Sequence, residues 1–77
     1  TADRYNEYIM TGLRTMWGVS LEGIKDNFGE KYLNYLENQS KKHIEETLLF
    51  VENGTLKTGE KGKFLVDGIA ADLFMLN

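Results

Sequence analysis

The chain has 77 residues, a net charge of −3 and 42% apolar residues, which is the composition of one small globular domain with its own core. It contains no cysteine and one histidine, which excludes disulfides, thiolate catalysis and cysteine-bound metals within this sequence, and argues against a histidine metal site. The acidic balance disfavours nucleic-acid binding, and no apolar run approaches the roughly 20 residues that cross a bilayer. We therefore expect a cytoplasmic domain without a membrane anchor. Because the sequence starts with Thr1 rather than methionine, we also expect it to be a piece of a longer protein.

The first predicted helix runs from about Arg4 to Trp17, with Asp3 as its N-cap. Apolar residues recur along one of its faces at helical spacing: Tyr5, Ile9, Leu13 and Met16. Gly12 lies within this face, where a glycine costs about 1 kcal/mol against alanine, so it predicts the close approach of another backbone. Gly18 is predicted to end the helix, because a left-handed terminal residue is least costly as glycine.

A second strip on the same helix supplies the candidate site residues. Glu7 and Arg14 are seven positions apart, so a helix would project both charges from the same side, with Met10 and Trp17 beside them. Arg14 can hold a carboxylate through two N–H groups. The side chains of Tyr8, Met10 and Trp17 can cover a flat macrocycle. The simpler interpretation is an Arg14 that pairs with Glu7 or with another domain, next to an apolar core or interface strip.

The middle of the chain is predicted to be helical. Ser20 is the expected N-cap of a short helix that ends at Gly29 and buries three apolar residues, Leu21, Ile24 and Phe28. Residues 30–47 also have a helical pattern. They form either two helices, 30–38 and 41–47 with Ser40 as the second cap, or one bent helix.

From Leu48 onwards the sequence pattern changes from helical spacing to the period of two that is typical of β-strands. The β-prone stretch Leu48 to Glu52 and the alternating stretch Thr55 to Thr58 flank Asn53-Gly54, which predicts a two-stranded hairpin. A last helix is expected from Gly59 to the C-terminus. It carries two apolar rows: Leu65, Ile69, Leu73 and Leu76 in one, and Phe64, Gly68, Ala71 and Met75 in the other. The expected fold is mainly α with a β-hairpin, in the order helix-helix-helix-hairpin-helix, which is winged-helix-like.

The ordered motifs resemble a known family. They are Glu7-x4-Gly12-Leu13-Arg14-x3-Gly18-Val19, then Phe28-Gly29, the hairpin, and G-K-F-L-x-D-G-I-A-x-D-L-F from Gly62 to Phe74. Together they resemble the C-terminal domain of the oxygen-independent coproporphyrinogen III oxidases, closest to the heme-chaperone-like branch of Bacteroides type. Two positions depart from the family pattern. Thr47 stands where a glycine is usual, and Thr58-Gly59 replaces Leu-Thr, which removes an apolar contact and a side-chain N-cap.

The resemblance implies that residues 1–77 are a single accessory domain of a longer radical-SAM protein, with no catalytic residue of its own. In that family the four-iron cluster and S-adenosylmethionine belong to an N-terminal radical-SAM domain with a Cys-x3-Cys-x2-Cys motif, and this sequence has no cysteine. The accessory domain would pack on that domain and help to shape the substrate region. The parent would oxidise coproporphyrinogen III or bind and deliver heme, and both branches stay open because they differ upstream.

Other polar residues suit structural roles better than chemical ones. His43 is an axial-ligand candidate for heme, but its neighbours Lys41 and Lys42 favour a solvated histidine. Asp67 and Asp72 are five apart on the predicted last helix and do not converge as an acid–base pair. Asp67 is expected either to cap its helix or to pair locally with a lysine four positions away, Lys63. A basic cluster lies near the hairpin: Lys57, Lys61 and Lys63. It could contact a phosphate, but a solvated wing is the preferred interpretation.

Two other functions are compatible with the predicted fold. A DNA-binding winged helix needs a basic recognition helix, but residues 30–47 carry three lysines against four glutamates, which disfavours it. A protein–protein interaction module would use the extra apolar row of the last helix. We expect the isolated chain to be a monomer, and its role in porphyrin chemistry is the preferred interpretation.

Overall fold

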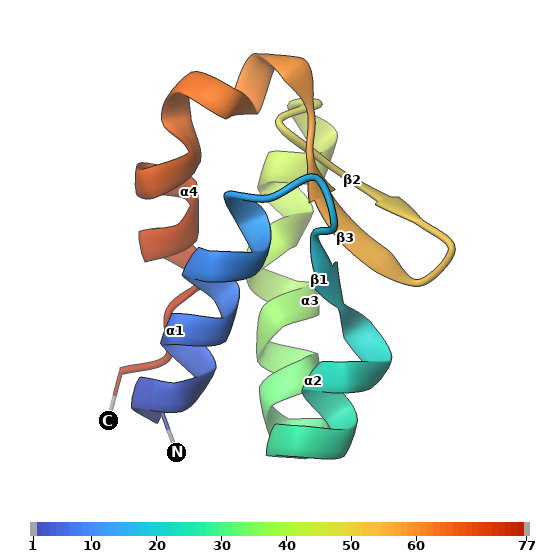
Figure 1. Cartoon of the computed structure of the whole chain (residues 1–77), viewed down its shortest axis with the longest axis vertical. Helices are drawn as coiled ribbons and strands as arrows, with labels where there is room; N and C mark the ends of the chain where they lie inside the picture. Colours follow the sequence, from blue (N-terminus) through green and yellow to red (C-terminus); the bar gives the residue numbers. More distant parts are fainter. Residues whose placement is uncertain (1, 77) are drawn as a thin grey trace.

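The computed structural model describes residues 2–76, which form four α-helices, one 3₁₀ segment and a three-stranded antiparallel sheet (Figure 1). The elements are α1 (Ala2–Leu13), β1 (Val19–Ser20), α2 (Leu21–Phe28), α3 (Glu30–Glu45), β2 (Leu49–Glu52), β3 (Thr55–Thr58), η1 (Glu60–Leu65) and α4 (Val66–Leu73). In Figure 1, α1 and α4 lie on one side of α3, and α2 and the sheet lie on the other. The predicted mainly helical, winged-helix-like fold with a hairpin is confirmed.

The core is made by apolar residues from nearly every element. Its buried members are Tyr5, Ile9, Leu13, Val19, Ile24, Leu36, Leu49, Leu56, Ile69, Ala70 and Leu73. Around Tyr5, the ring of Phe28 packs edge-on at 5.9 Å and that of Tyr32 lies tilted at 5.0 Å, which are favourable aromatic spacings. Burial of such large side chains supplies most of the stability available to a domain of this size.

Helix α1 is shorter than predicted. It begins at Ala2, so Asp3 lies in its first turn instead of capping it, and it ends at Leu13 rather than at Trp17. The chain turns at this point because Val19 must enter the core, and Gly12 permits the turn. A Cβ at Gly12 would lie 2.6 Å from Val19 Cγ2 and 2.8 Å from the carbonyl oxygen of Gly18.

The early end of α1 also overturns the prediction for Met16. This residue lies beyond the helix and is 77% exposed, so it is not a core residue. The helix end is closed from another part of the chain, since the hydroxyl of Thr58 donates a hydrogen bond to the carbonyl oxygen of Leu13 over 3.0 Å. The expected loss of a contact at Thr58 is therefore offset by a polar contact that sequence spacing did not indicate.

Helices α2 and α3 follow their predicted signals closely. The Ser20 hydroxyl accepts a 3.0 Å hydrogen bond from the Gly23 amide as the N-cap of α2, and Gly29 ends that helix with φ 99°. The two interpretations of residues 30–47 are now resolved in favour of one helix, Glu30–Glu45. Ser40 lies buried within it and donates to the carbonyl of Glu37, so it does not begin a new helix.

The C-terminus of α3 closes in a Schellman motif. The Leu48 amide donates to the His43 carbonyl over 2.8 Å, and the Thr47 amide donates to the Ile44 carbonyl over 3.0 Å. This geometry requires a left-handed residue at the first position beyond the cap, and Thr47 has φ 61°. A β-branched residue is therefore held where glycine is the usual choice.

The predicted hairpin is present, and a third strand extends it. Asn53 and Gly54 have φ 51° and 75°, as a tight hairpin turn requires, and β2 pairs with β3 along their full length. The added strand β1 pairs Val19 with Leu56 on the other edge of β3. Gly18, with φ 75°, lies against the backbone of β3 and directs the chain into β1, although we had expected it to end α1. A two-residue strand is too short to produce an alternating pattern, so it was missed.

The last helix is also shorter than predicted. Residues 60–65 form a 3₁₀ segment, and α4 ends at Leu73. In the first predicted apolar row Ile69 and Leu73 are buried, but Leu65 is 55% exposed and Leu76 is 85% exposed. The helix ends early because side chains from other helices bond to the backbone of the residues that follow. Tyr35 OH donates to the Phe74 carbonyl over 2.7 Å.

The C-terminal segment is held to the first turns of α1 in the same way. The Asn6 side chain donates to the Met75 carbonyl over 3.2 Å and accepts from the Met75 amide over 2.8 Å. The Tyr5 hydroxyl donates to the Leu73 carbonyl over 2.9 Å. Burial, together with the nearby Tyr35 and Tyr32 hydroxyls, raises the pKa of Tyr5 well above its ordinary value, so this hydroxyl keeps its proton.

Candidate functional site: a basic groove at the end of helix α1

A groove of about 400 Å³ lies where the turn after α1 meets β3 and the start of α4. We name it the basic groove. Its walls are Leu13, Arg14, Thr15, Met16, Lys57, Thr58, Lys63 and Val66. All of its ionisable lining residues are basic, although the chain as a whole has a net charge of −3. Apolar walls with three cationic groups are suited to an anionic ligand that has an apolar body.

Arg14 forms an ion pair across the fold, with Asp67 of α4. Its Nε and Nη2 groups donate to Asp67 Oδ1 over 3.2 Å and 2.8 Å. The predicted pairs, Arg14 with Glu7 and Asp67 with Lys63, are therefore both wrong. The reason is that Arg14 lies beyond the end of α1 and is directed towards α4.

The Arg14–Asp67 pair is weak enough to exchange. The two side chains are 55% and 68% exposed, and exposed pairs contribute about 0–1 kcal/mol. A carboxylate that enters the basic groove can therefore replace Asp67 at little cost. Such a ligand would meet a guanidinium group that is already close to the groove wall.

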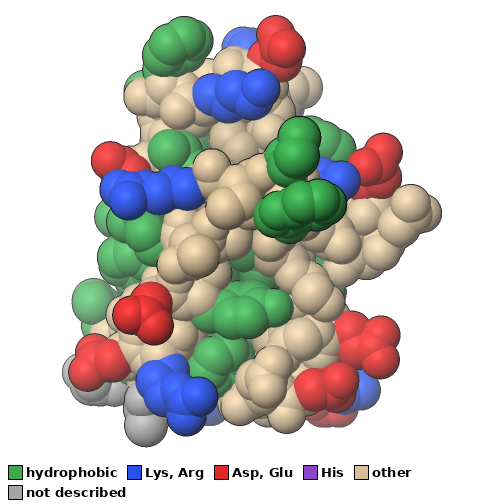
Figure 2. Space-filling view, viewed as in Figure 1, with side chains coloured by type: hydrophobic (Ala, Val, Ile, Leu, Met, Phe, Trp, Pro, Cys, Tyr) green, Lys and Arg blue, Asp and Glu red, His purple; other side chains and the backbone are tan. Residues whose placement is uncertain are grey.

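An exposed apolar lip borders the groove. Met16 is 77% exposed and Trp17 is 76% exposed, both in the turn that follows α1. The turn is held by the Thr15 hydroxyl, which donates to the Gly12 carbonyl over 3.0 Å and accepts from the Trp17 amide over 3.3 Å. Figure 2 shows apolar side chains on this face, with both basic and acidic side chains around them. Large apolar residues exposed together in this way are typical of a surface that meets a partner or ligand.

The four predicted site residues do not converge. Arg14 lines the basic groove and Trp17 lies in the adjoining turn, but Glu7 lines a separate hollow of about 530 Å³ between α1 and α2. Met10 is half-buried and packs against the core. The predicted strip assumed a continuous helix to residue 17, and the early end of α1 separates its two halves.

Lys57 and Lys63 are groove residues that the sequence did not assign to the site. Their basic cluster was recognised, but it was interpreted as a solvated wing. Lys57 is a partly buried member of the groove wall and donates to Glu52 over 3.0 Å. No spacing rule connects these lysines with Arg14, because the hairpin and η1 bring them together only in the folded chain.

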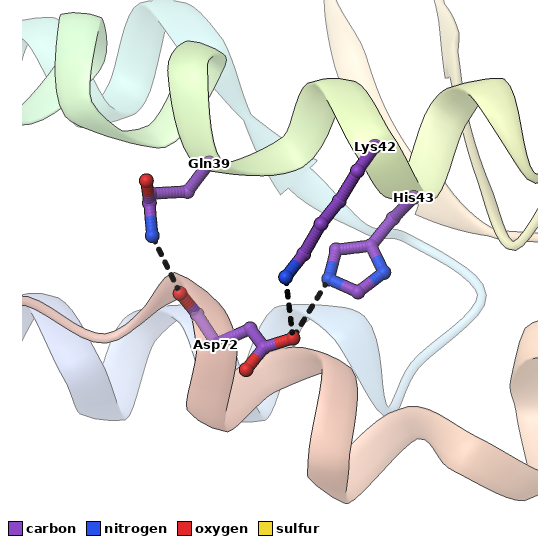
Figure 3. A network of polar contacts seen from close by, with 4 residues as sticks. All are labelled: Gln39, Lys42, His43 and Asp72. Atoms are coloured by element: carbon purple, nitrogen blue, oxygen red, sulfur yellow. Dashed lines mark hydrogen bonds and ion pairs between the residues drawn. The ribbon is translucent and has the colours of Figure 1, made fainter.

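A second polar cluster joins α3 to α4 (Figure 3). His43 Nε2 lies 3.2 Å from Asp72 Oδ2, Lys42 Nζ lies 3.4 Å from the same oxygen, and Gln39 donates to the Asp72 carbonyl over 3.2 Å. His43 is 6% exposed, so the prediction of a solvated histidine is wrong. Asp67 and Asp72 have different partners, Arg14 and His43, although both line the hollow between α3 and the segment η1–α4. That they do not act as an acid–base pair stays a prediction.

Neither the basic groove nor the polar cluster around Asp72 fits the cofactors that the family resemblance implies. Within residues 2–76 there is no group of three or more His, Cys, Asp or Glu side chains placed to hold a metal ion. An iron–sulfur cluster needs thiolate ligands, which this sequence does not supply. In His43, Nε2 faces Asp72 and Nδ1 is buried, so neither nitrogen is open to a heme iron.

The fold defines a class: a small, mainly helical, winged-helix-like domain with a three-stranded antiparallel sheet. Residues 1–65 match the family described as the HemN C-terminal domain, and the chain belongs to that family. No curated protein and no solved structure matches it. No helix in the described part of the chain is long and apolar enough to cross a membrane.

Proposed function

We propose that this chain is the C-terminal accessory domain of a HemN-like radical-SAM protein and has no catalytic chemistry of its own. In this role it packs on the N-terminal radical-SAM domain of the same protein and helps to shape the region that receives a porphyrin or heme. The basic groove is the observation that supports this proposal most directly. It combines three cationic side chains with apolar walls on the surface of an otherwise acidic chain.

The groove chemistry suits a macrocycle that carries carboxylates. Arg14 would exchange its exposed partner Asp67 for a ligand carboxylate, and the two lysines that also line the groove, Lys57 and Lys63, would add charge. Trp17, with Met16, would cover an apolar surface, either that of the macrocycle or that of the catalytic domain. The same groove serves an oxidase, which must hold its substrate, and a chaperone, which must hold heme.

The test is the variant Arg14→Ala in the full-length protein, with Arg4→Ala as the matched control. Arg4 is an exposed arginine of α1 that lines the other hollow, away from the basic groove. A hydrogen-bonded charge is worth about 1.5–3 kcal/mol, so Arg14→Ala should weaken porphyrin or heme binding by roughly tenfold or more, and Arg4→Ala should not. The variant Arg14→Lys, which keeps the charge but loses the two-pronged geometry, should be intermediate.

A separate control tests whether the Arg14→Ala variant still folds. Because the Arg14–Asp67 pair is exposed, Arg14→Ala should change the thermal unfolding midpoint of the 77-residue domain only slightly. If Arg14→Ala binds porphyrin and heme as tightly as Arg4→Ala in the full-length protein, Arg14 has no part in ligand handling and the groove loses its proposed role.

A further inference from the structure

Two pairs of exposed apolar side chains lie beside the basic groove. Met16 and Trp17, in the turn after α1, are 77% and 76% exposed, and Phe64 and Leu65, in η1, are 94% and 55% exposed. Met16 lines the groove, and Phe64 directly follows a lysine that lines it too, Lys63. Figure 1 shows both segments in the upper half of the fold, away from the start of α1. We name these four apolar residues the apolar ridge.

A ligand held in the basic groove leaves most of the apolar ridge uncovered. Trp17, Phe64 and Leu65 are not among the residues that line the groove. Single exposed apolar residues are common on proteins, but several large ones beside one groove are typical of a surface that a second macromolecule covers. Each of them loses water-exposed apolar area on docking, which favours the bound state. The ridge therefore suits an occupant larger than a small ligand.

Contacts within the domain hold the apolar ridge in shape. In the turn after α1 the Thr15 hydroxyl donates to the Gly12 carbonyl over 3.0 Å. In η1 the Gly62 amide donates to the Gly59 carbonyl over 3.0 Å, and Gly62 is buried against the carbonyl of Leu48. A surface that is already ordered loses little conformational entropy when it binds. The ridge is thus prepared for docking before a partner arrives.

Charge beside the apolar ridge indicates the kind of partner. Residues 14–17 and 57–66, which carry the ridge and much of the groove wall, contain one acidic side chain, Glu60, and four of the chain's nine basic ones. The four are Arg14, Lys57, Lys61 and Lys63. The other eleven of the chain's twelve acidic residues lie elsewhere in the sequence. An acidic partner surface is therefore favoured at the ridge.

Two of these basic groups have no acidic partner within the domain. Arg14 and Lys57 are bonded to exposed carboxylates, but among the described residues no ion pair involves Lys61 or Lys63. Acidic groups on a docked surface would meet these free cations. A second copy of this chain would instead bring the same cations together, which disfavours a homodimer through the ridge.

We propose that the apolar ridge is the surface through which this domain docks on the N-terminal radical-SAM domain of its own protein. The surface that it meets there is apolar at its centre and acidic at its edge. This inference rests on the proposed function, and it assigns Trp17 to the contact between domains rather than to the macrocycle. A domain docked on the ridge would also close the basic groove from outside and shield a bound carboxylate from water.

The test is hydroxyl-radical footprinting of the full-length protein and of the 77-residue chain, whose described residues form their own core. Trp17 and Phe64 should be at least fivefold less reactive in the full-length protein. Two exposed apolar side chains away from the ridge are the matched controls and should react equally in both forms. Leu76 follows the segment that bonds to the first turns of α1, and Val51 lines a hollow against α3.

Variants of the full-length protein separate the apolar and charged contributions. Phe64→Ser, which alters only an exposed side chain, should raise the reactivity of Trp17 at least threefold towards that of the 77-residue chain. The double variant Lys61→Glu with Lys63→Glu should do the same, because it places acids against an acidic surface. Its matched control reverses two exposed lysines of α3, Lys31→Glu with Lys41→Glu, and should leave Trp17 protected.

The outcomes separate this inference from the proposed function. If Leu76 or Val51 is protected while Trp17 and Phe64 stay fully reactive, the domain packs through another face, and the inference is overturned while the proposed packing stands. If no residue of the domain is protected in the full-length protein, both the inference and the proposed packing fail. Trp17 that stays protected in the Lys61→Glu, Lys63→Glu variant would refute the acidic partner surface.

Discussion

Replacing Thr47 with glycine should stabilise the domain. Thr47 has φ 61° at the position where the Schellman motif of α3 requires a left-handed residue. Its side chain is exposed, and its hydroxyl bonds only to the carbonyl of the preceding residue, Glu46. Thr47→Gly therefore removes backbone strain and loses a contact that water can replace.

The expected gain follows from two opposing terms. A left-handed conformation costs an L-residue about 1–2 kcal/mol, and a β-branched side chain belongs at the upper end of that range. Glycine adds freedom to the unfolded chain, which lowers stability by about 0.5–1 kcal/mol. The net gain is about 1 kcal/mol, which corresponds to a rise of roughly 4–8 °C in the unfolding midpoint of a domain of this size.

The assay is thermal and urea unfolding followed by far-ultraviolet circular dichroism. Thr47→Asn should give a smaller gain, because asparagine tolerates the left-handed region better than threonine but keeps a Cβ and therefore part of the strain. Gly54→Ala is the reverse control, because it adds a side chain at a left-handed position instead of removing one. Gly54 has φ 75° and open space around it, so alanine there should destabilise by about 1–2 kcal/mol through backbone strain alone. Unchanged or lower stability of both Thr47 variants would refute the strain argument.

Other predictions concern close packing and buried ionisation. Gly12→Ala should destabilise by about 1–3 kcal/mol in urea unfolding, because the added Cβ would lie 2.6 Å from Val19 Cγ2; a stability equal to that of the natural chain would contradict the packing described for α1. Gly68→Ala, also in a helix but with nothing near its Cβ, should instead stabilise by up to about 1 kcal/mol, and a loss there would mean that α4 does not form as described. The raised pKa of Tyr5 predicts a stability that is fully present below pH 10.0, the ordinary pKa of tyrosine, and falls above it by up to about 1.4 kcal/mol per pH unit, because the unfolded chain loses this proton first. Alkaline urea titrations should detect the fall, with Tyr5→Phe as the control that removes the ionising phenol, and a flat profile of the natural chain would contradict it.

Local signals in the sequence determined most of the elements. Asn53-Gly54 specified the hairpin because both positions favour positive φ, and Ser20 with Gly29 bounded α2 through short-range capping. The spacing of Tyr5 and Ile9 identified the buried face of α1. These features depend on residues only a few positions apart, so a single sequence is sufficient to recognise them.

The tertiary structure alone decided where helices end and which charges meet. Arg14 bonds to a carboxylate 53 positions away, and Tyr5 bonds to a carbonyl 68 positions away. His43 is buried because α4 brings Asp72 against it, although its sequence neighbours are lysines. Contacts of this kind depend on how whole elements pack, and their partners leave no periodic trace in the sequence. For the same reason the basic groove, assembled from the end of α1, β3 and η1, became visible only in the folded chain.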